Sequence, residues 1–73
     1  MQEILIGVDI GTTRIKAVAT DLNLQVLADY AEPTPWIHIK NSSEIDMVLL
    51  AQTVITVASK AADLAGGKVI AIG

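Results

Sequence analysis

Residues 8–13 read Val8-Asp9-Ile10-Gly11-Thr12-Thr13 and join two apolar runs. The run before them is short and rich in β-branched residues, which predicts a strand over Glu3–Ile10 that is buried on both faces. Asp9 lies where this strand ends, and a carboxylate there is costly to desolvate unless a cation or a metal pairs with it. The run after them predicts a second strand over Arg14–Asp21, so the two strands form a hairpin.

The loop of this hairpin has the composition of an anion cradle. Gly11 allows a ligand to approach the backbone closely, and Thr12 and Thr13 offer two hydroxyls and two backbone N–H groups. Arg14 and Lys16 alternate onto one face of the second strand. The loop is therefore a candidate phosphate site with two cations beside it.

Asp9 would repel a phosphate at this loop unless a divalent cation lay between them. Mg²⁺ fills that role with carboxylate and phosphate oxygens, so the loop predicts Mg²⁺ as well as phosphate. The common phosphate loops do not fit, because no Gly-Lys-Ser/Thr is present and the spacing of Gly7 and Gly11 is not that of a dinucleotide fingerprint. Taken alone, the loop is equally compatible with a simple turn in which Asp9 bonds its own backbone.

The hairpin resembles the first phosphate motif of the actin-like ATPase superfamily, which includes sugar kinases, heat-shock chaperones and actin homologues. The resemblance rests on residues 9–13 and on the strand that follows them. Its FGGY carbohydrate kinase branch also matches Asp21 at the end of the second strand and a third strand over Leu24–Tyr30. Thr34-Pro35-Trp36 keeps the Pro and Trp of that branch's Pro-Gly-Trp element, and Asn41–Ile45 replaces its usual Asp-Pro helix start. The likeness spans the chain, but only residues 1–21 are specific.

The resemblance implies that residues 1–73 are the N-terminal part of the first domain of an ATP-dependent carbohydrate kinase, which transfers the γ-phosphate of ATP to a sugar or polyol hydroxyl. It implies that Asp9 holds Mg²⁺ through water and that Gly11, Thr12 and Thr13 contact the β- and γ-phosphates. The catalytic Asp, the second phosphate loop and the adenosine pocket come from later sequence in that family. No catalytic residue is therefore expected in this chain, which would be inactive alone.

The two cations of the second strand differ in how well they match the family. Lys16 stands at a recurrent basic position, whereas Arg14 stands where the family usually has a small hydroxyl or Gly. Arg14 could contact phosphate or point to solvent. For both, the alternative is a salt bridge with Glu3 or Asp21 across the hairpin, which contributes roughly 0–1 kcal/mol when exposed.

Composition excludes several classes of function. The net charge of -3, with scattered acids and 5 Lys and Arg, disfavours a nucleic-acid partner. The chain has no Cys, no basic leader and no apolar run of about 18 residues, so we expect a cytoplasmic protein without a membrane partner. One domain at most fits in 73 residues, and a hydrophobic content of 52% is high for a free-standing surface.

The segment after the second strand begins with a turn at Asp21-Leu22-Asn23. The third strand alternates apolar and polar residues, which predicts a half-exposed strand at the sheet edge. Residues 31–41 are predicted to be irregular because Pro33 and Pro35 favour extended neighbours. We expect Trp36 to be a packing anchor, in preference to a sugar-stacking residue, and His38 to be a surface residue.

A long helix follows the Asn41-Ser42-Ser43 cluster. Either Asn41 with Glu44 or Ser43 with Asp46 would form a reciprocal cap, and Gly66-Gly67 would end the helix after Ala65. The polar stripe is narrow. One apolar face contains Val48, Ala51, Ile55, Ala58 and Ala62, and Leu50, Val54, Val57 and Ala61 broaden it. We expect the rest of the kinase chain to cover the face of the helix 44–65 that the sheet leaves open.

The last run, residues 68–72, predicts a buried strand parallel to the first. The predicted fold class is α/β: a three-stranded antiparallel meander, a crossover helix and a fourth strand, in the sheet order three, two, one, four. This order resembles part of a ribonuclease H-like domain, the fold of actin-like ATPases.

Two rival functions remain at this point. One is a non-sugar actin-like ATPase of the chaperone, cell-division or pilus-assembly type, in which the same loop drives conformational change. The other is a small non-catalytic module in which the hairpin is only a turn. The Pro35-Trp36 element before a capped helix favours the kinase.

Overall fold

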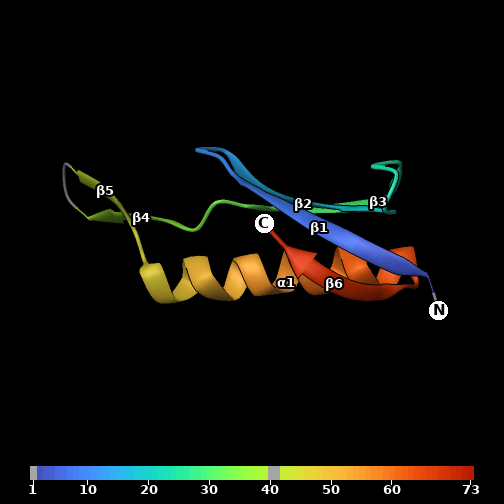
Figure 1. Cartoon of the computed structure of the whole chain (residues 1–73). Coiled ribbons are helices and arrows are strands. Elements are labelled where there is room, and N and C mark those ends of the chain that lie inside the picture. Colours follow the sequence, from blue (N-terminus) through green and yellow to red (C-terminus); the bar gives the residue numbers. More distant parts are fainter. Residues whose placement is uncertain (1, 40–41) are drawn as a thin grey trace.

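The computed structural model describes residues 2–39 and 42–73 and has the predicted α/β architecture. Three antiparallel strands are followed by a hairpin and a helix, and the last strand returns parallel to the first (Figure 1). The main sheet has the predicted order, β3-β2-β1-β6, and β4 and β5 form a second sheet. The elements are β1 (Glu3–Ile10), β2 (Arg14–Thr20), β3 (Val26–Pro33), β4 (Trp36–Ile39), β5 (Ser42–Ile45), α1 (Met47–Ala65) and β6 (Lys68–Ile72).

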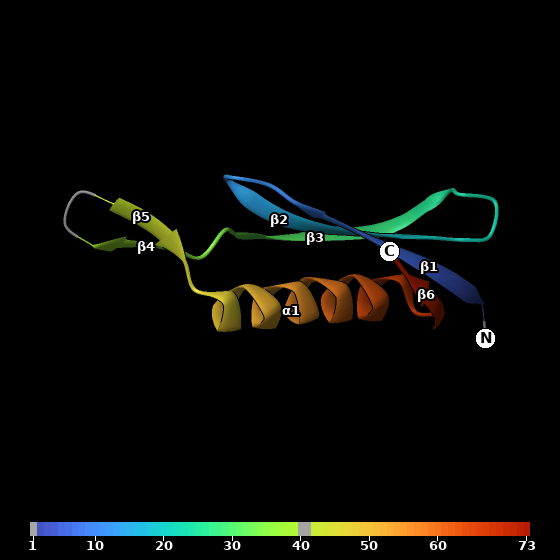
Figure 2. The ribbon, with the colours of Figure 1, turned by 60° about the vertical axis from the view of Figure 1, so that its left-hand side comes forward.

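Helix α1 packs on one face of the main sheet and leaves the other face open (Figures 1 and 2). Alternate residues of β1 and β2 face the helix because successive side chains of a strand point to opposite sides. The prediction that β1 is buried on both faces is therefore wrong: Ile4 and Ile6 are buried, whereas Glu3 and Gly7 on the open face are exposed. The buried core is Ile4, Ile6, Ile15, Ala17, Ala19, Val57, Ala58 and Ala61.

The turn between β2 and β3 is longer than predicted. Asp21 Oδ1 accepts hydrogen bonds from the backbone N–H groups of Asn23 (2.9 Å) and Gln25 (3.0 Å), and Leu24 has a positive φ of 64°. These bonds keep residues 21–25 out of the ladder, so β3 begins at Val26 and not at Leu24. Its position at the sheet edge is confirmed.

The prediction that residues 31–41 are irregular is wrong for most of the segment. β3 continues to Pro33, which an edge strand tolerates because the N–H that proline lacks is not needed in the ladder. β4 then pairs with β5, with Trp36 opposite Ile45 and His38 opposite Ser43. His38 is exposed, as predicted, and its Nδ1 lies 3.0 Å from Ser43 Oγ.

Helix α1 begins later than predicted because Ser42–Ile45 is a strand. Asp46 is the N-cap, and its Oδ1 accepts hydrogen bonds from the N–H groups of Val48 (2.9 Å) and Leu49 (3.2 Å). The predicted pairing of Asn41 with Glu44 lies partly outside the described residues, and the helix does not extend back to Glu44. The predicted end is confirmed, since Gly66 adopts the left-handed conformation of a C-cap.

The apolar surface of α1 is wider than the sheet that it covers. Val57, Ala58 and Ala61 are buried, whereas Val48 and Ile55 on the same wide arc are exposed. β6 is parallel to β1 as predicted, but the prediction that it is buried is wrong, because every residue of Lys68–Ile72 is exposed. The flank of α1 and β6 therefore leave apolar side chains uncovered.

The sequence-based prediction that no helix could span a membrane is too strict. By length and composition alone, α1 is long and apolar enough to cross a membrane. This is weak support for a membrane location, because a helix that packs on a sheet can have the same composition. In this structure the buried side chains of α1 contact the sheet.

Candidate functional site

The loop between β1 and β2 is closed by a backbone hydrogen bond from Gly11 N to Arg14 O, 3.0 Å long. The Gly11 N–H is therefore already bonded and would not contact a ligand while this bond is kept. Gly11 is needed for space: a Cβ there would lie 2.9 Å from Arg14 O. The predicted phosphate contact of Gly11 is therefore not made by its N–H in this conformation, and the observed role of Gly11 is to leave space. Thr12 and Thr13 keep the free donors of the loop.

A segment distant in sequence holds all three carbonyls of the loop. The Thr34 hydroxyl donates to Gly11 O (2.6 Å), and the Thr34 backbone N–H donates to Thr13 O (3.1 Å). The indole Nε1–H of Trp36 donates to Thr12 O (2.6 Å). We call Thr34 and Trp36 the carbonyl clamp.

The carbonyl clamp determines where the loop amides point. All described peptide bonds are trans, and in a trans peptide the N–H points opposite to the C=O. Because the carbonyls of Gly11 and Thr12 point toward the clamp, the N–H groups of Thr12 and Thr13 point away from it. These two N–H groups donate to no other group among the described residues.

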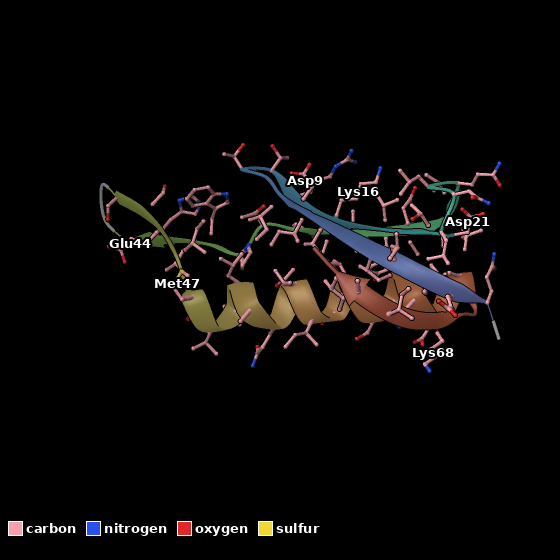
Figure 3. All side chains as sticks on the ribbon, viewed as in Figure 1. Asp9, Lys16, Asp21, Glu44, Met47 and Lys68 are labelled. Carbon is pink, nitrogen blue, oxygen red and sulfur yellow. The ribbon has the colours of Figure 1, made fainter. Side chains whose placement is uncertain are left out.

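The free amides are on the same side of the molecule as Asp9. The segment that follows β3 passes between the loop tip and the N-terminal end of α1, so donors pointing away from it face the open side of the sheet (Figures 1 and 2). Asp9 lies opposite Lys16 in the β1–β2 register, and both side chains project from the open face (Figure 3). A carboxylate, two amides and an ammonium group therefore share one surface.

Asp9 is exposed, so the sequence argument that its desolvation demands a partner does not apply. Its carboxylate accepts no hydrogen bond from any group that the structure describes. The alternative in which Asp9 stabilises the turn by bonding its own backbone is therefore not what the structure adopts. Asp9 is free to bind a cation from solvent.

Lys16 pairs with neither Glu3 nor Asp21, as the alternative reading expected, but with Asp29 of β3. Its Nζ lies 3.9 Å from Asp29 Oδ2, and the two side chains are 36% and 56% exposed. An ion pair this long and this exposed contributes roughly 0–1 kcal/mol, so Lys16 can turn toward an anion at little cost. Arg14 is exposed and has no ion-pair partner among the described residues.

No group of three or more His, Cys, Asp or Glu that could hold a metal occurs within residues 2–39 and 42–73. Asp9 is a single carboxylate, which suits Mg²⁺ only in part, since this ion is usually held by one or two carboxylates together with water and phosphate oxygens. The donor set thus fits an ion that arrives with a phosphate, and does not fit a resident metal.

The sequence singles out the loop, Asp9 and Lys16 as candidates but does not reveal the carbonyl clamp. Thr34 was not singled out, although it is the one buried polar side chain among the described residues, at 6% exposure. Trp36 was expected to be a packing anchor, yet it is 40% exposed and bonds the loop. Neither bond has a local sequence signal, because each joins residues 23 or 24 positions apart.

No protein-family model matches this chain, and no curated protein matches it significantly.

Proposed function

We propose that this chain is the N-terminal phosphate-binding part of an ATP-dependent carbohydrate kinase. The observation that carries the proposal is a loop whose carbonyls are all bonded on one side and whose Thr12 and Thr13 amides are free on the other, beside the exposed carboxylate of Asp9. Phosphoryl transfer is catalysed mainly by positioning and by neutralising phosphate charge, which is what amides, a cation and Mg²⁺ supply.

In this proposal each residue of the loop has one role. The amides of Thr12 and Thr13 donate to the β- and γ-phosphates of ATP, and Gly11 leaves room for the close turn. Asp9 holds Mg²⁺ through water, and the ion would offset negative charge on the phosphates. Lys16 adds a positive charge next to them, and Arg14 is a second, less well matched cation.

The rest of the active centre is proposed to lie in sequence outside this chain. The site is an open surface on which Asp9, Thr12 and Thr13 are exposed, so these residues alone would not exclude water from the reaction. The exposed apolar flank of α1 and β6 supports the proposal that further sequence covers it. The sheet order is compatible with the proposal that the chain is part of a ribonuclease H-like domain. A cytoplasmic location is proposed from the family resemblance alone.

The test uses the protein expressed from its natural gene, with its intact mass measured first. ADP release from Mg-ATP is then assayed with a panel of sugars and polyols. We expect at least one of them to stimulate ADP release. Asp9→Asn should lower turnover strongly while leaving the fold intact, because Asp9 bonds nothing else that is described. Asp21→Asn is the matched control, since Asn keeps the Oδ1 that holds its turn.

Three results would contradict the proposal in different ways. Unchanged turnover in Asp9→Asn would remove the Mg²⁺ role. ADP release that no sugar or polyol stimulates would point to a non-sugar actin-like ATPase. Absence of nucleotide binding, together with cooperative unfolding of residues 1–73 as a monomer, would favour the small non-catalytic module.

A further inference from the structure

We propose that Thr34 and Trp36 are positioning residues that set the polarity of the loop, by holding its carbonyls so that its amides face the anion. This inference rests on the proposed function for its ligand, a polyphosphate, but the arrangement itself is testable without any ligand. Both side chains bond loop carbonyls, which point opposite to the free amides, so neither needs to contact the phosphates.

The carbonyl clamp consists of two residues that bond three consecutive carbonyls. Thr34 uses both its hydroxyl and its backbone N–H, and Trp36 uses its indole. Pro35 lies between them, and the Trp36 N–H bonds Thr34 O (2.9 Å) in the i to i+2 pattern of a γ-turn. Since proline restricts φ to about -65°, the two donors are held in their relative positions before they meet the loop.

The carbonyl clamp matters because a short loop can reverse a peptide plane. A reversed plane would point a carbonyl oxygen at the anion and replace an attractive dipole with a repulsive one. With all three carbonyls bonded, reversing any plane breaks a hydrogen bond, and for Gly11 it leaves the buried hydroxyl of Thr34 without its acceptor. The clamp therefore preorganises the donors, which removes an ordering cost from binding.

The same contacts link the loop to the β4–β5 hairpin. Trp36 is the first residue of β4 and pairs with Ile45, the last residue of β5, directly before the N-cap of α1. The Thr12 carbonyl that accepts the indole N–H belongs to the same peptide group as the Thr13 N–H. A ligand bound to that N–H therefore changes the environment of the indole. The Trp36 indole N–H is therefore expected to report binding at the loop.

The experiment compares Thr34→Val, Thr34→Ser and Trp36→Phe in the ¹⁵N-labelled protein expressed from its natural gene. The first removes the hydroxyl at nearly constant shape, the second restores it, and the third removes the indole donor. Without ligand, we measure amide hydrogen exchange of Gly11, whose N–H is protected by its bond to Arg14 O within the loop. With Mg²⁺ and inorganic triphosphate, we measure the dissociation constant and the Trp36 indole resonance, which Trp36→Phe identifies.

We expect Thr34→Val and Trp36→Phe each to speed exchange of the Gly11 amide, because a loop released from the clamp opens its Gly11–Arg14 bond more often. Each variant should also weaken triphosphate binding by roughly three- to tenfold, the effect of losing one hydrogen bond. Thr34→Ser should restore both values, and triphosphate should shift the indole resonance. If Thr34→Val fails to fold, Trp36→Phe still decides, because that side chain is partly exposed.

Exchange and affinity that stay at the wild-type values in Thr34→Val and Trp36→Phe would overturn the positioning role. If the wild type binds neither triphosphate nor nucleotide, the proposed function fails, and the ligand-free exchange rates alone decide the positioning role.

Discussion

The turns at the two ends of β2 satisfy their backbone hydrogen-bonding groups in opposite ways. At one end, the backbone groups of residues 21–25 bond within the turn. Asp21 Oδ1 accepts hydrogen bonds from two N–H groups. The Asp21 carbonyl accepts from the Leu24 N–H, and the Asp21 N–H donates to Gln25 O. At the other end, residues 11–13 have their carbonyls bonded by Thr34 and Trp36 and leave two amides free. The first turn is self-contained, and the second depends on a distant segment.

The difference teaches what separates a simple turn from a candidate binding loop. Both turns contain or follow an Asp, so composition alone does not distinguish them. In the self-contained turn the carboxylate bonds the amides, whereas Asp9 leaves the amides of its loop unbonded. A loop whose acceptors are occupied and whose donors are free is suited to bind an anion.

The largest effect is expected from Gly11→Ala. The added Cβ would lie 2.9 Å from the backbone oxygen of Arg14, so the loop must shift. We expect a destabilisation of about 1–3 kcal/mol, as for overpacking, and a loss of triphosphate affinity of about tenfold or more. Chemical denaturation and a binding titration measure the two effects.

Gly7→Ala is the control for that variant, because a Cβ at Gly7 meets nothing within 4 Å and the residue lies in the same hairpin. Its stability should stay within about 0.5 kcal/mol of the wild type, as is usual for surface changes. Equal effects of the two variants would mean that the loop has no special geometry.

The second prediction compares removal of the Asp21 carboxylate with removal of the Asp9 carboxylate. Asp21→Ala removes the acceptor of two backbone N–H groups and should cost about 0.5–2 kcal/mol of stability, with triphosphate affinity unchanged. Asp9→Ala should do the reverse, weakening Mg²⁺-dependent binding with little loss of stability. The measurements are the free energy of unfolding and the dissociation constant with and without Mg²⁺. If Asp9→Ala destabilises as much as Asp21→Ala, the contrast between the turns is wrong.

A smaller effect is expected from the cation beside the loop. Lys16→Met and Asp29→Asn break the same ion pair and should each change stability by at most about 1 kcal/mol. Lys16→Met should weaken triphosphate binding by a few-fold at low salt, and added salt should reduce the difference. Asp29→Asn should leave binding unchanged or improve it, because it frees Lys16. Equal losses of triphosphate affinity in both variants would mean that Lys16 acts only through its ion pair with Asp29.

The smallest effect concerns the edge strand that leads into the carbonyl clamp. The Tyr30 hydroxyl donates to Glu32 Oε1 (2.9 Å), and this bond raises the pKa of Tyr30 above its ordinary value. Because the raised pKa belongs to the folded state, this contribution to stability is complete below about pH 10 and is lost as the pH rises through the folded-state pKa.

Tyr30→Phe should remove that alkaline loss, as measured by unfolding midpoints between neutral and alkaline pH. Its triphosphate affinity at neutral pH should equal that of the wild type, because Tyr30 does not contact the loop. A weakened affinity would show that the clamp depends on the edge strand as well as on Thr34 and Trp36.

Much of the main sheet could be predicted from sequence because its signals are local. The bounds of β1, the edge position of β3, the end of α1 at Gly66 and the parallel return of β6 all follow from apolar periodicity and turn residues. The burial of β1 and β6 could not be predicted, because an apolar run does not indicate how many layers cover the strand. The start of α1 was misplaced because Ser42 and Ser43 are compatible with both a cap and a strand.

The site was predictable only in part for a similar reason. The type and spacing of Asp9, Thr12 and Thr13 predict phosphate chemistry without any knowledge of the fold, and this stays a prediction. The hydrogen bonds from Thr34 and Trp36 are tertiary contacts, so no pattern within the loop reveals them. The pairing of Lys16 with Asp29 was missed in the same way, because it depends on the β2–β3 register.

The most direct test is a titration of the ¹⁵N-labelled protein, expressed from its natural gene, with Mg-ADP, following the backbone amide resonances of both turns. We predict that the Thr12 and Thr13 resonances shift with one saturable dissociation constant, while those of Asn23 and Gln25 stay unchanged. Saturation that leaves Thr12 and Thr13 unshifted, or that shifts both turns equally, would contradict the claim that this loop is the phosphate site.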